Sequence, residues 1–398
     1  MSILSSLPLA PRDPILGLTE AFLADDRADK VNLGVGVYLG ADGKVPLLDS
    51  VRTAEAALAA APVARGYQPI DGLPAYTRSM RELVFGADSE PVASGRVVTI
   101  QGLGGTGALK IGAEFLKLTD AARTVLISDP SWENHLALFT RAGFEVGSYR
   151  YYAPESGGID VAGMLDDLRA AAPGTVVVLH ACCHNPTGYD LGEAEWARVA
   201  DVIVERGLVP LLDLAYQGFS AGIEPDGAVI TRFAALGIPV LVASSFSKSF
   251  SLYGERVGGL SVVAADAGEA ARVLSQLKVT VRTTYSSPPT HGAAVVAKVL
   301  MDPELRALWA SELEGMRLRI RGMRTALVEA LAAAGASRDF GFIAHQVGMF
   351  SYCGLTAEQM HVLREADGVY GTDAGRICVA ALNPGNVDHV ARAIAAVL

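Results

Sequence analysis

The sequence is poor in cysteine, and its few cysteines follow no pairing pattern. Only four of the 398 residues are cysteine, at positions 182, 183, 353 and 378. Disulfide-rich secreted domains carry more cysteines at regular spacing, so we expect reduced thiols and a cytoplasmic protein. Cys182 and Cys183 are adjacent, without the two-residue gap of common metal motifs, and adjacent residues on a strand point to opposite faces. We therefore expect no metal site.

An excess of positive charge and long apolar runs are also missing. Asp and Glu number 43 against 33 Lys and Arg, which gives a net charge of −10 and predicts no nucleic-acid partner. The N-terminus lacks the basic and apolar regions of a signal peptide, and the longest apolar run, residues 175–183, is too short to span a membrane. With 51% hydrophobic and 19% charged residues, the chain is typical of a well-packed enzyme of two or three domains.

What the sequence does contain is an alternation of apolar strands and helices. Runs rich in Val, Leu and Ile predict buried strands at residues 97–101, 124–129, 175–182, 209–214 and 240–244. Helical segments separate them, among them 106–118, a helix from residue 132, and 193–206. The pattern predicts an α/β fold with a largely parallel sheet that binds its ligand at the carboxyl ends of the strands.

The C-terminal part of the sequence has a different pattern. A long helical stretch rich in Glu and Arg is predicted at 303–334. It is followed by a strand, a helix, a strand and a helix at 348–353, 356–365, 376–381 and 387–397. We interpret this part as a smaller α/β domain onto which the N-terminal segment folds.

Two polar loops follow predicted strands and could bind a phosphate. Residues 101–107 read Gln-Gly-Leu-Gly-Gly-Thr-Gly, and the pattern fits a phosphate turn, a dinucleotide site with Asp129 as its acid, or a plain tight turn. Residues 244–256 read Ser-Ser-Phe-Ser-Lys-Ser-Phe-Ser-Leu-Tyr-Gly-Glu-Arg. Lys248 there could act as a nucleophile and Arg256 could bind a phosphate, or the segment could be an exposed polar loop.

Two further motifs end predicted strands. Asp213 closes the apolar strand 209–214, where a carboxylate needs a partner such as a protonated ring nitrogen, or else caps the next turn. Tyr216 follows three residues later. His-Asn-Pro-Thr-Gly at 184–188 places the amide of Asn185 beyond another strand, although these residues could simply form a turn.

Taken together and in this order, the motifs resemble those of the class I aminotransferases of the aspartate/aromatic group, over nearly the full chain. The stretch from Ser244 to Val263 is especially similar to the bacterial aromatic-amino-acid (tyrosine) branch. The resemblance implies fold type I of the pyridoxal-phosphate enzymes, with a mostly parallel seven-stranded sheet in a large domain and a smaller α/β domain. It implies an N-terminal arm at 1–13, a small domain at 14–45 and 316–398, and a large cofactor-binding domain at 46–315.

The resemblance also implies that the cofactor is pyridoxal 5′-phosphate and assigns residues to it. Lys248 would bond to the cofactor aldehyde and move the substrate proton, while Asp213 would pair with the ring nitrogen. Other residues would hold the ring or its phosphate: Tyr216, Asn185 and Trp132 for the ring, with His135 behind Asp213, and Gly105, Thr106, Ser245 and Arg256 for the phosphate. Tyr67 would reach the phosphate of the neighbouring subunit in a homodimer with active sites at the interface.

Substrate binding is assigned in the same way. Arg376 and the Gly36 backbone would bind the α-carboxylate, with Trp132 and Asn185 nearby. Arg282, across the subunit boundary, would bind an acidic side chain. Alone, each of these residues could equally be a packing or surface residue.

The implied reaction is transamination of aromatic and acidic L-amino acids with 2-oxoglutarate, in a ping-pong cycle between pyridoxal and pyridoxamine forms. The aspartate branch carries more polar residues near Leu39, Val45 and Ser287, which favours aromatic substrates here. Thr106 and Val37 are more similar to the aspartate branch, so an aspartate aminotransferase with minor aromatic activity is the alternative. A nicotinamide dehydrogenase, a pyridoxal-phosphate lyase or decarboxylase, and a binding protein on this fold also stay open; visible colour that borohydride abolishes would exclude the nicotinamide enzyme.

Overall fold

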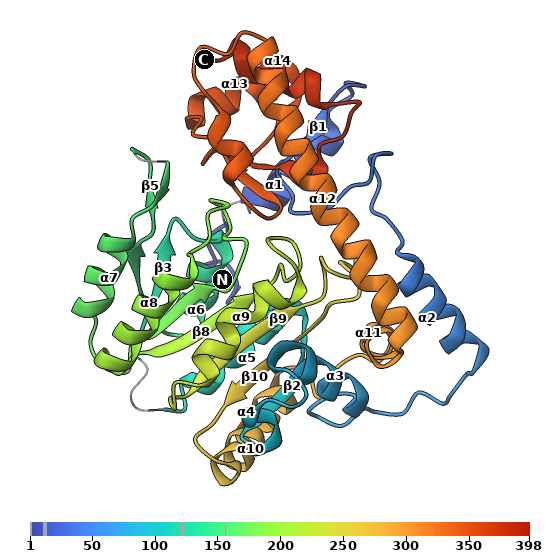
Figure 1. The fold of residues 1–398 in the computed structure, drawn as a ribbon, viewed down its shortest axis with the longest axis vertical. Coiled ribbons are helices and arrows are strands. Elements are labelled where there is room, and N and C mark those ends of the chain that lie inside the picture. Colours follow the sequence, from blue (N-terminus) through green and yellow to red (C-terminus); the bar gives the residue numbers. More distant parts are fainter. Residues whose placement is uncertain (1, 11–13, 120–122, 156) are drawn as a thin grey trace. The chain divides into compact units, whose positions relative to one another are not determined.

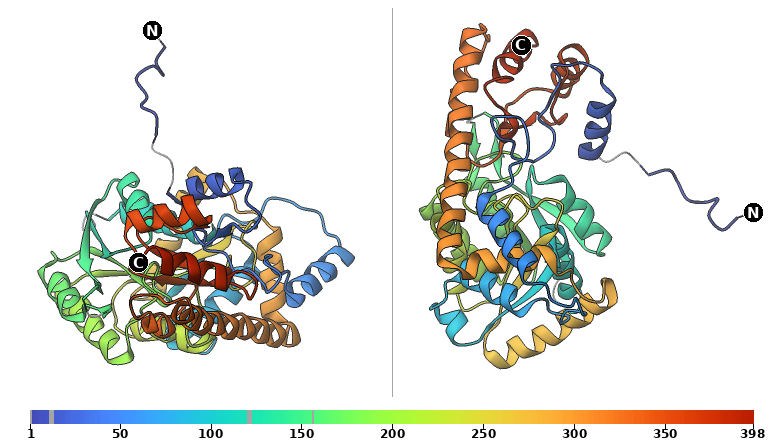
Figure 2. Two further views of the ribbon diagram at one scale, coloured as in Figure 1. Left: turned by 90° about the horizontal axis from the view of Figure 1, so that it is seen from above. Right: turned by 90° about the vertical axis from the view of Figure 1, so that its right-hand side faces the viewer.

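The computed structural model describes residues 2–10, 14–119, 123–155 and 157–398. The chain divides into two compact units: residues 1–44, 322–344 and 349–398 form the smaller unit, and residues 45–321 and 345–348 the larger. The division expected from the sequence, with an arm at 1–13, stays a prediction. Residues 1 and 11–13 of that arm lie outside the described residues. Residues 2–10, dark blue in Figure 2, form neither helix nor strand, and their leucines and Ile3 are exposed.

The larger unit is built on a seven-stranded sheet (Figure 1). In spatial order its strands are β2 (Val97–Leu103), β10 (Val257–Val263), β9 (Val240–Ser245), β8 (Val209–Leu214), β7 (Val176–His180), β3 (Thr124–Asp129) and β4 (Glu145–Arg150). β10 is antiparallel to both of its neighbours, and the other pairs are parallel. This arrangement confirms the expected mostly parallel sheet of seven strands.

Helices cover both faces of this sheet. On one face lie α5 (Gly104–Leu116), α6 (Glu133–Arg141) and α10 (Ala267–Thr284); on the other lie α3 (Pro74–Phe85), α7 (Val161–Ala170), α8 (Glu193–Arg206) and α9 (Ile223–Ala234). β7 and β8 are buried along almost their whole length, as both-sided covering requires. The remaining elements of this unit are α2 (Asp49–Ala60), α4 (Glu90–Ala93), α11 (His291–Met301) and the pair β5 (Tyr152–Ala153) and β6 (Gly158–Ile159).

The smaller unit brings the two ends of the chain together. β1 (Val31–Asn32) pairs in parallel with β12 (Val369–Tyr370), and β11 (Phe350–Tyr352) pairs with β13 (Arg376–Cys378). Its helices are α1 (Pro14–Ala24), α13 (Ala357–Asp367) and α14 (Val387–Ala396), with short 3-10 turns η1 (Gly341–His345) and η2 (Val379–Ala381). The strand expected at 376–381 is wrong in its second half, because the chain turns at η2.

One helix belongs to both units. α12 (Pro303–Ala333) lies in the larger unit up to residue 321 and in the smaller unit from residue 322. Among the described residues, no helix is both long enough and apolar enough to cross a bilayer.

Candidate functional site

The carboxyl edge of the parallel strands gathers the polar residues of the sequence motifs. Asp213 of β8 lies opposite His180 of β7 and Ala243 of β9. The loop that follows β9 carries Lys248. Because β10 runs in the opposite direction, it begins at this edge, and Arg256 immediately precedes it. Residues far apart in the sequence therefore meet where a parallel sheet normally binds its ligand.

Lys248 is half-buried at this edge, and its amine lies 4.6 Å from the centre of the Tyr216 ring. The pKa of Lys248 is lowered to about 8: burial lowers it most, the negative charge of Asp213 partly offsets this, and the positive charge of Arg256 adds to the lowering. An amine with this pKa is partly uncharged at neutral pH. Only the uncharged form attacks a carbonyl carbon, so Lys248 can act as a nucleophile.

Asp213 is a buried carboxylate held by a histidine. It is 4% exposed and accepts a hydrogen bond from Nε2 of His135 at 3.0 Å. Nδ1 of His135 in turn lies 3.0 Å from Oγ of Ser131. Burial raises the pKa of Asp213, but the bond from His135 and the positive charge of Lys248 more than offset this, and the net pKa lies below the usual value. An ionised carboxylate in this place can hold a proton on a facing ring nitrogen.

The start of α5 and Arg256 form a cradle that suits a phosphate. α5 begins at Gly104 without a side-chain cap. The Gly104 N–H donates to the backbone carbonyl of Arg256 at 2.9 Å, which leaves the N–H groups of Gly105 and Thr106 available to an anion. A Cβ at Gly104 would lie 2.6 Å from Nη2 of Arg256, and a Cβ at Gly105 would lie 3.1 Å from Cβ of Ser245. Thr106 and Arg256 line a hollow of about 380 Å³. The fit of a phosphate here depends on glycine, because any side chain at 104 would collide with the guanidinium.

Arg256 is itself held in place. Its guanidinium donates to the carbonyl of Tyr253 at 2.9 Å and to Oγ of Ser247 at 3.3 Å. Its backbone has a φ of 54°. The guanidinium thus keeps a fixed position at the mouth of the helix, where charge-assisted bonds to a phosphate would be strong.

Asn185 and Trp132 lie beside the same edge. Asn185 is buried in a turn that His184 supports, with ring nitrogens 2.9 Å from Ser128 Oγ and 2.9 Å from Thr187 Oγ1. The Trp132 ring is half-buried and meets the His135 ring edge-on at 5.1 Å. Trp132 therefore contacts the histidine that is hydrogen-bonded to Asp213, and Asn185 follows the strand next to that of Asp213.

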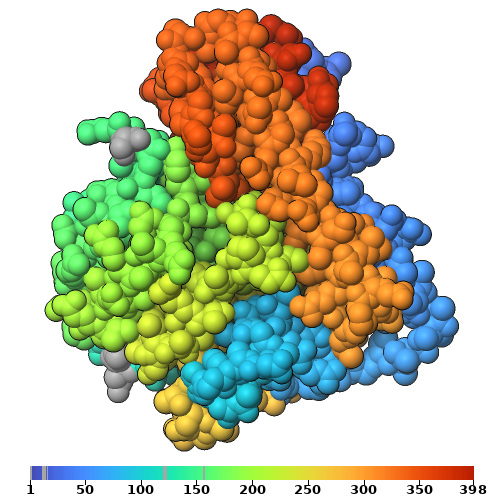
Figure 3. Space-filling model, viewed as in Figure 1, coloured from blue at the N-terminus to red at the C-terminus, as the bar shows by residue number. Residues whose placement is uncertain are grey.

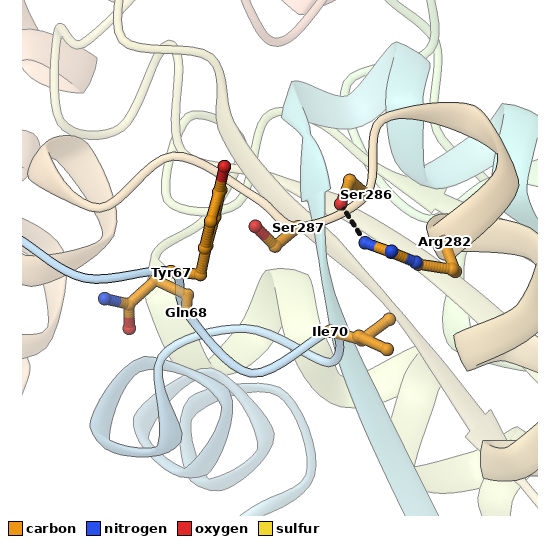
Figure 4. A pocket seen from close by; sticks show the side chains of 6 residues that line it. All are labelled: Tyr67, Gln68, Ile70, Arg282, Ser286 and Ser287. Carbon is orange, nitrogen blue, oxygen red and sulfur yellow. Dashed lines mark hydrogen bonds between the residues drawn. The ribbon is translucent and has the colours of Figure 1, made fainter.

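Tyr67 and Arg282 line a pocket of which Lys248 is not a lining residue. The pocket has a volume of about 410 Å³, and Gln68, Ile70, Ser286 and Ser287 also line it (Figure 4). The Arg282 guanidinium donates to Oγ of Ser286 (Figure 4). Tyr67 is 98% exposed, and Arg282 is exposed as well. Their assignment to a neighbouring subunit's site stays a prediction.

Gly36 and Arg376 meet inside the smaller unit. Arg376 is 2% exposed, donates to the carbonyl of Gly34 at 2.8 Å, and stands over the Phe350 ring at 4.4 Å. A Cβ at Gly36 would lie 2.6 Å from the same ring. Phe350 thus brings the arginine and the glycine backbone together, as a carboxylate-binding pair would require.

Two residues near the site were missed by sequence reasoning. The buried His180 ring contacts the rings of His135 and His184, and neither of its nitrogens has a hydrogen-bond partner among the described residues. Burial lowers the pKa of His180 to about 3, so the ring is neutral. Its position at the end of a strand, like that of Asp213, was an available signal.

The second missed residue is Trp309 of α12. Its indole Nε1 donates to the backbone carbonyl of Ser249 at 2.7 Å, and its ring stacks on Phe250 with ring centres 4.6 Å apart. Ser249 and Phe250 immediately follow Lys248, so Trp309 holds the lysine loop from outside.

A nucleophilic lysine, a paired carboxylate and a phosphate cradle at one edge of an α/β sheet define a pyridoxal-phosphate enzyme. The sequence profile of the family described as aminotransferase class I and II matches residues 28–394. The chain belongs to this family, and it is a pyridoxal-phosphate-dependent aminotransferase of fold type I.

Relatives and solved structures that match this chain do so over nearly its whole length. The chain is 58% identical to an aspartate aminotransferase of Pseudomonas aeruginosa, covering 100% of both chains. It is 51% identical to an aromatic-amino-acid aminotransferase of Escherichia coli, covering 97% of this chain and 98% of the relative. Among solved structures, it is similar to a crystal structure of an aromatic-amino-acid aminotransferase from Burkholderia pseudomallei covalently bound to pyridoxal phosphate. The two chains are 61% identical with a TM-score of 0.97, and the match covers 100% of each chain.

Proposed function

We propose that this chain transfers the amino group of aromatic and acidic L-amino acids to 2-oxo acids, with 2-oxoglutarate as an acceptor. The observation that carries the proposal is the cluster of Lys248, Asp213 and Arg256 at one sheet edge. Their charges interact, and Lys248 carries an amine that is partly uncharged at neutral pH. Aspartate- and aromatic-named relatives of high identity support both substrate classes.

The residues of the larger unit would divide the work on the cofactor. When bound, pyridoxal phosphate supplies an electron sink for the bond that breaks at the substrate Cα. Lys248 would bond to the aldehyde, and its Nζ would later accept the substrate Cα proton and deliver it to the former aldehyde carbon of the cofactor. Asp213 would keep the ring nitrogen protonated, and His135 would fix the orientation of Asp213. Tyr216 and Asn185 would donate to the ring oxygen, and Trp132 would cover the ring.

The phosphate would be held by groups that the fold already brings together. Gly105 and Thr106 would donate backbone N–H groups from the start of α5, and Ser245 and Arg256 would add side-chain bonds. Tyr67 would reach the phosphate bound to a second copy of the chain. Its 98% exposure in the single chain supports this role, because an aromatic ring of this size is normally covered.

The two ends of the substrate would be bound by arginines. Arg376, backed by the Gly36 backbone, would bind the α-carboxylate. Arg282 would bind an acidic side chain, and a charged hydrogen bond of this kind contributes about 1.5–3 kcal/mol. Burial of an aromatic ring yields a similar amount, so both classes can be accepted if Arg282 moves aside. Leu39, Val45 and Ser287 favour the aromatic class.

We further propose a homodimer with active sites at the subunit interface, in the cytoplasm. The exposed apolar residues of segment 2–10 and the exposed Tyr67 support the dimer, since such residues seldom stay uncovered. All four cysteines are buried free thiols, which suits a reducing compartment. In such a dimer the N-terminal arm, the small domain and the large domain would keep the bounds expected from the sequence.

Steady-state rates with a panel of amino-acid donors and 2-oxoglutarate test the proposal. We expect turnover of phenylalanine, tyrosine and aspartate, with parallel lines in double-reciprocal plots because the first product leaves before the acceptor binds. Exclusive turnover of aspartate would favour the alternative, an aspartate aminotransferase with minor aromatic activity, which the Pseudomonas relative also supports. No transfer from either class would refute the proposal.

A further inference from the structure

Two adjacent cysteines lie close together just beyond β7. β7 ends at His180, and Cys183 has a φ of 53°, in the left-handed region. The chain is therefore not extended here, and the expectation that Cys182 and Cys183 point to opposite faces is wrong. The Sγ atoms of both cysteines and a carboxylate oxygen of Asp226 all lie within 4.8 Å of one another.

The cluster opens onto a groove of about 960 Å³ that α8 and α9 border. These two helices lie on the face of the molecule shown in Figure 3, in green and yellow-green. Cys182 and Asp226 line the groove, together with the carboxylates of Asp190, Glu193 and Glu224. Arg232, the arginine found among the described residues that line it, is paired with Glu193 at 3.4 Å. The groove thus offers access and a negative field, both of which favour a cation.

The carboxylates near the thiols are held rigidly. The Asp226 carboxylate accepts backbone N–H bonds from Gly218, Ser220 and Ala221 at 2.8, 3.0 and 2.8 Å. A carboxylate offers about four lone-pair sites, so one is left for a further ligand.

Asp190 holds the backbone at Cys183. Its carboxylate accepts from the N–H groups of Cys183 and His184 at 2.7 and 2.9 Å. The Asp226 carboxylate and the backbone of Cys183 are therefore held by second contacts, which strengthen binding in known metal sites.

We propose that Cys182, Cys183 and Asp226 form a binding site for a thiophilic divalent cation of the Zn²⁺ and Cd²⁺ type. Two sulfurs and one carboxylate oxygen are a ligand set that Zn²⁺ accepts, and its fourth position would hold a water molecule in the groove. Each thiol loses its proton as its Sγ–metal bond forms, so one M²⁺ enters and two H⁺ leave, with no change of oxidation state. None of the three proposed ligands is assigned to pyridoxal phosphate, although Cys183 Sγ lies 3.7 Å from the backbone carbonyl oxygen of Tyr216, which is so assigned.

Titration of the purified holoenzyme with Cd²⁺ tests the site, in a non-chelating buffer with a phosphine reductant. The ultraviolet absorption of the Cd–thiolate bond reports coordination directly. We expect one Cd²⁺ per chain, two protons released per ion, and loss of the absorption when Zn²⁺ competes. Cys182→Ala should weaken binding by at least about tenfold, since even indirect contacts to a metal ligand contribute that much.

A matched control uses the two cysteines of the smaller unit. The double variant Cys353→Ala/Cys378→Ala keeps the proposed ligands and should bind Cd²⁺ like the parent. Asp226→Asn, which keeps a hydrogen-bonding oxygen, should weaken binding without removing the thiolate absorption. The visible absorption of the cofactor verifies folding of each variant. The proposal fails if no thiolate absorption forms, if Cys182→Ala leaves it unchanged, or if the control variant abolishes it.

Discussion

The hydrogen bond from Trp309 to the loop of Lys248 leads to a local and measurable prediction. In Trp309→Phe, an aromatic ring can still stack on Phe250, but the donor to the carbonyl of Ser249 is lost. That carbonyl lies in a buried contact at 2.7 Å and accepts no other backbone bond within the described chain. A buried carbonyl without a donor costs about 1–3 kcal/mol, so the free energy needed to open the loop should fall by that amount.

Hydrogen exchange measures this opening residue by residue. The amides of Phe250 and Ser251 donate to the carbonyls of Phe246 and Lys248 at 3.2 and 3.0 Å, so they exchange only when the loop opens. A loss of about 1–3 kcal/mol corresponds to exchange faster by about 5- to 150-fold. Because the loop carries Lys248, kcat should fall while KM for the amino acid changes little, and the pH at which the cofactor colour changes should shift.

Trp196→Phe is the control for this prediction. Trp196 is 9% exposed and packs edge-on against Phe233, but its indole nitrogen donates to no residue in the described part of the chain. The same atoms are removed without breaking a hydrogen bond. If both variants changed the exchange of the lysine loop equally, or if neither did, the role of Trp309 in positioning Lys248 would be refuted.

Three further predictions concern the catalytic groups. Lys248→Ala should still bind pyridoxal phosphate but lose nearly all transamination and the borohydride-sensitive colour; near-normal turnover would exclude the assigned role. The pKa of Lys248 is about 8, and only the uncharged amine attacks. The rate at which pyridoxal phosphate attaches to the cofactor-free chain, measured by its visible absorption, should therefore rise with pH and level off above about pH 8. A rate that does not change from about pH 6 to 9 would contradict this. Arg282→Ala should lower kcat/KM for aspartate by roughly 10- to 150-fold but much less for phenylalanine, because only the acidic side chain loses a charged bond; equal losses would show that Arg282 does not bind the side chain.

The sequence predicts the sheet edge well because its central strands are apolar without interruption. Uninterrupted runs of Val and Leu indicate strands that are buried on both faces of the sheet. The polar residues that follow each run then lie at the carboxyl edge. Asp213 and Lys248 were found in this way. β4 and β10 were not predicted, because β4 is a half-exposed edge strand with polar residues, and β10 has two glycines at its second and third positions.

Contacts between distant segments could not be predicted from the sequence. The bond from Trp309 to Ser249 joins residues 60 positions apart, and it depends on how a helix packs on a loop. The strand expected at 175–182 ends at His180 because the chain turns at Cys183. The backbone of Cys183 is in the left-handed region, and no residue pattern predicts that conformation for a cysteine. A side chain's neighbours follow from packing, which periodicity alone does not encode.

Because β10 is antiparallel to β9, the loop between them carries both Lys248 and Arg256. β9 ends and β10 begins at the same edge of the sheet, and the two strands are paired. Residues 246–256 therefore form a loop between two neighbouring strands, and this loop carries both the Lys248 amine and the Arg256 guanidinium. An insertion or deletion within it would displace both groups together. The length of this segment is therefore as strict a requirement for the chemistry as the identity of its lysine.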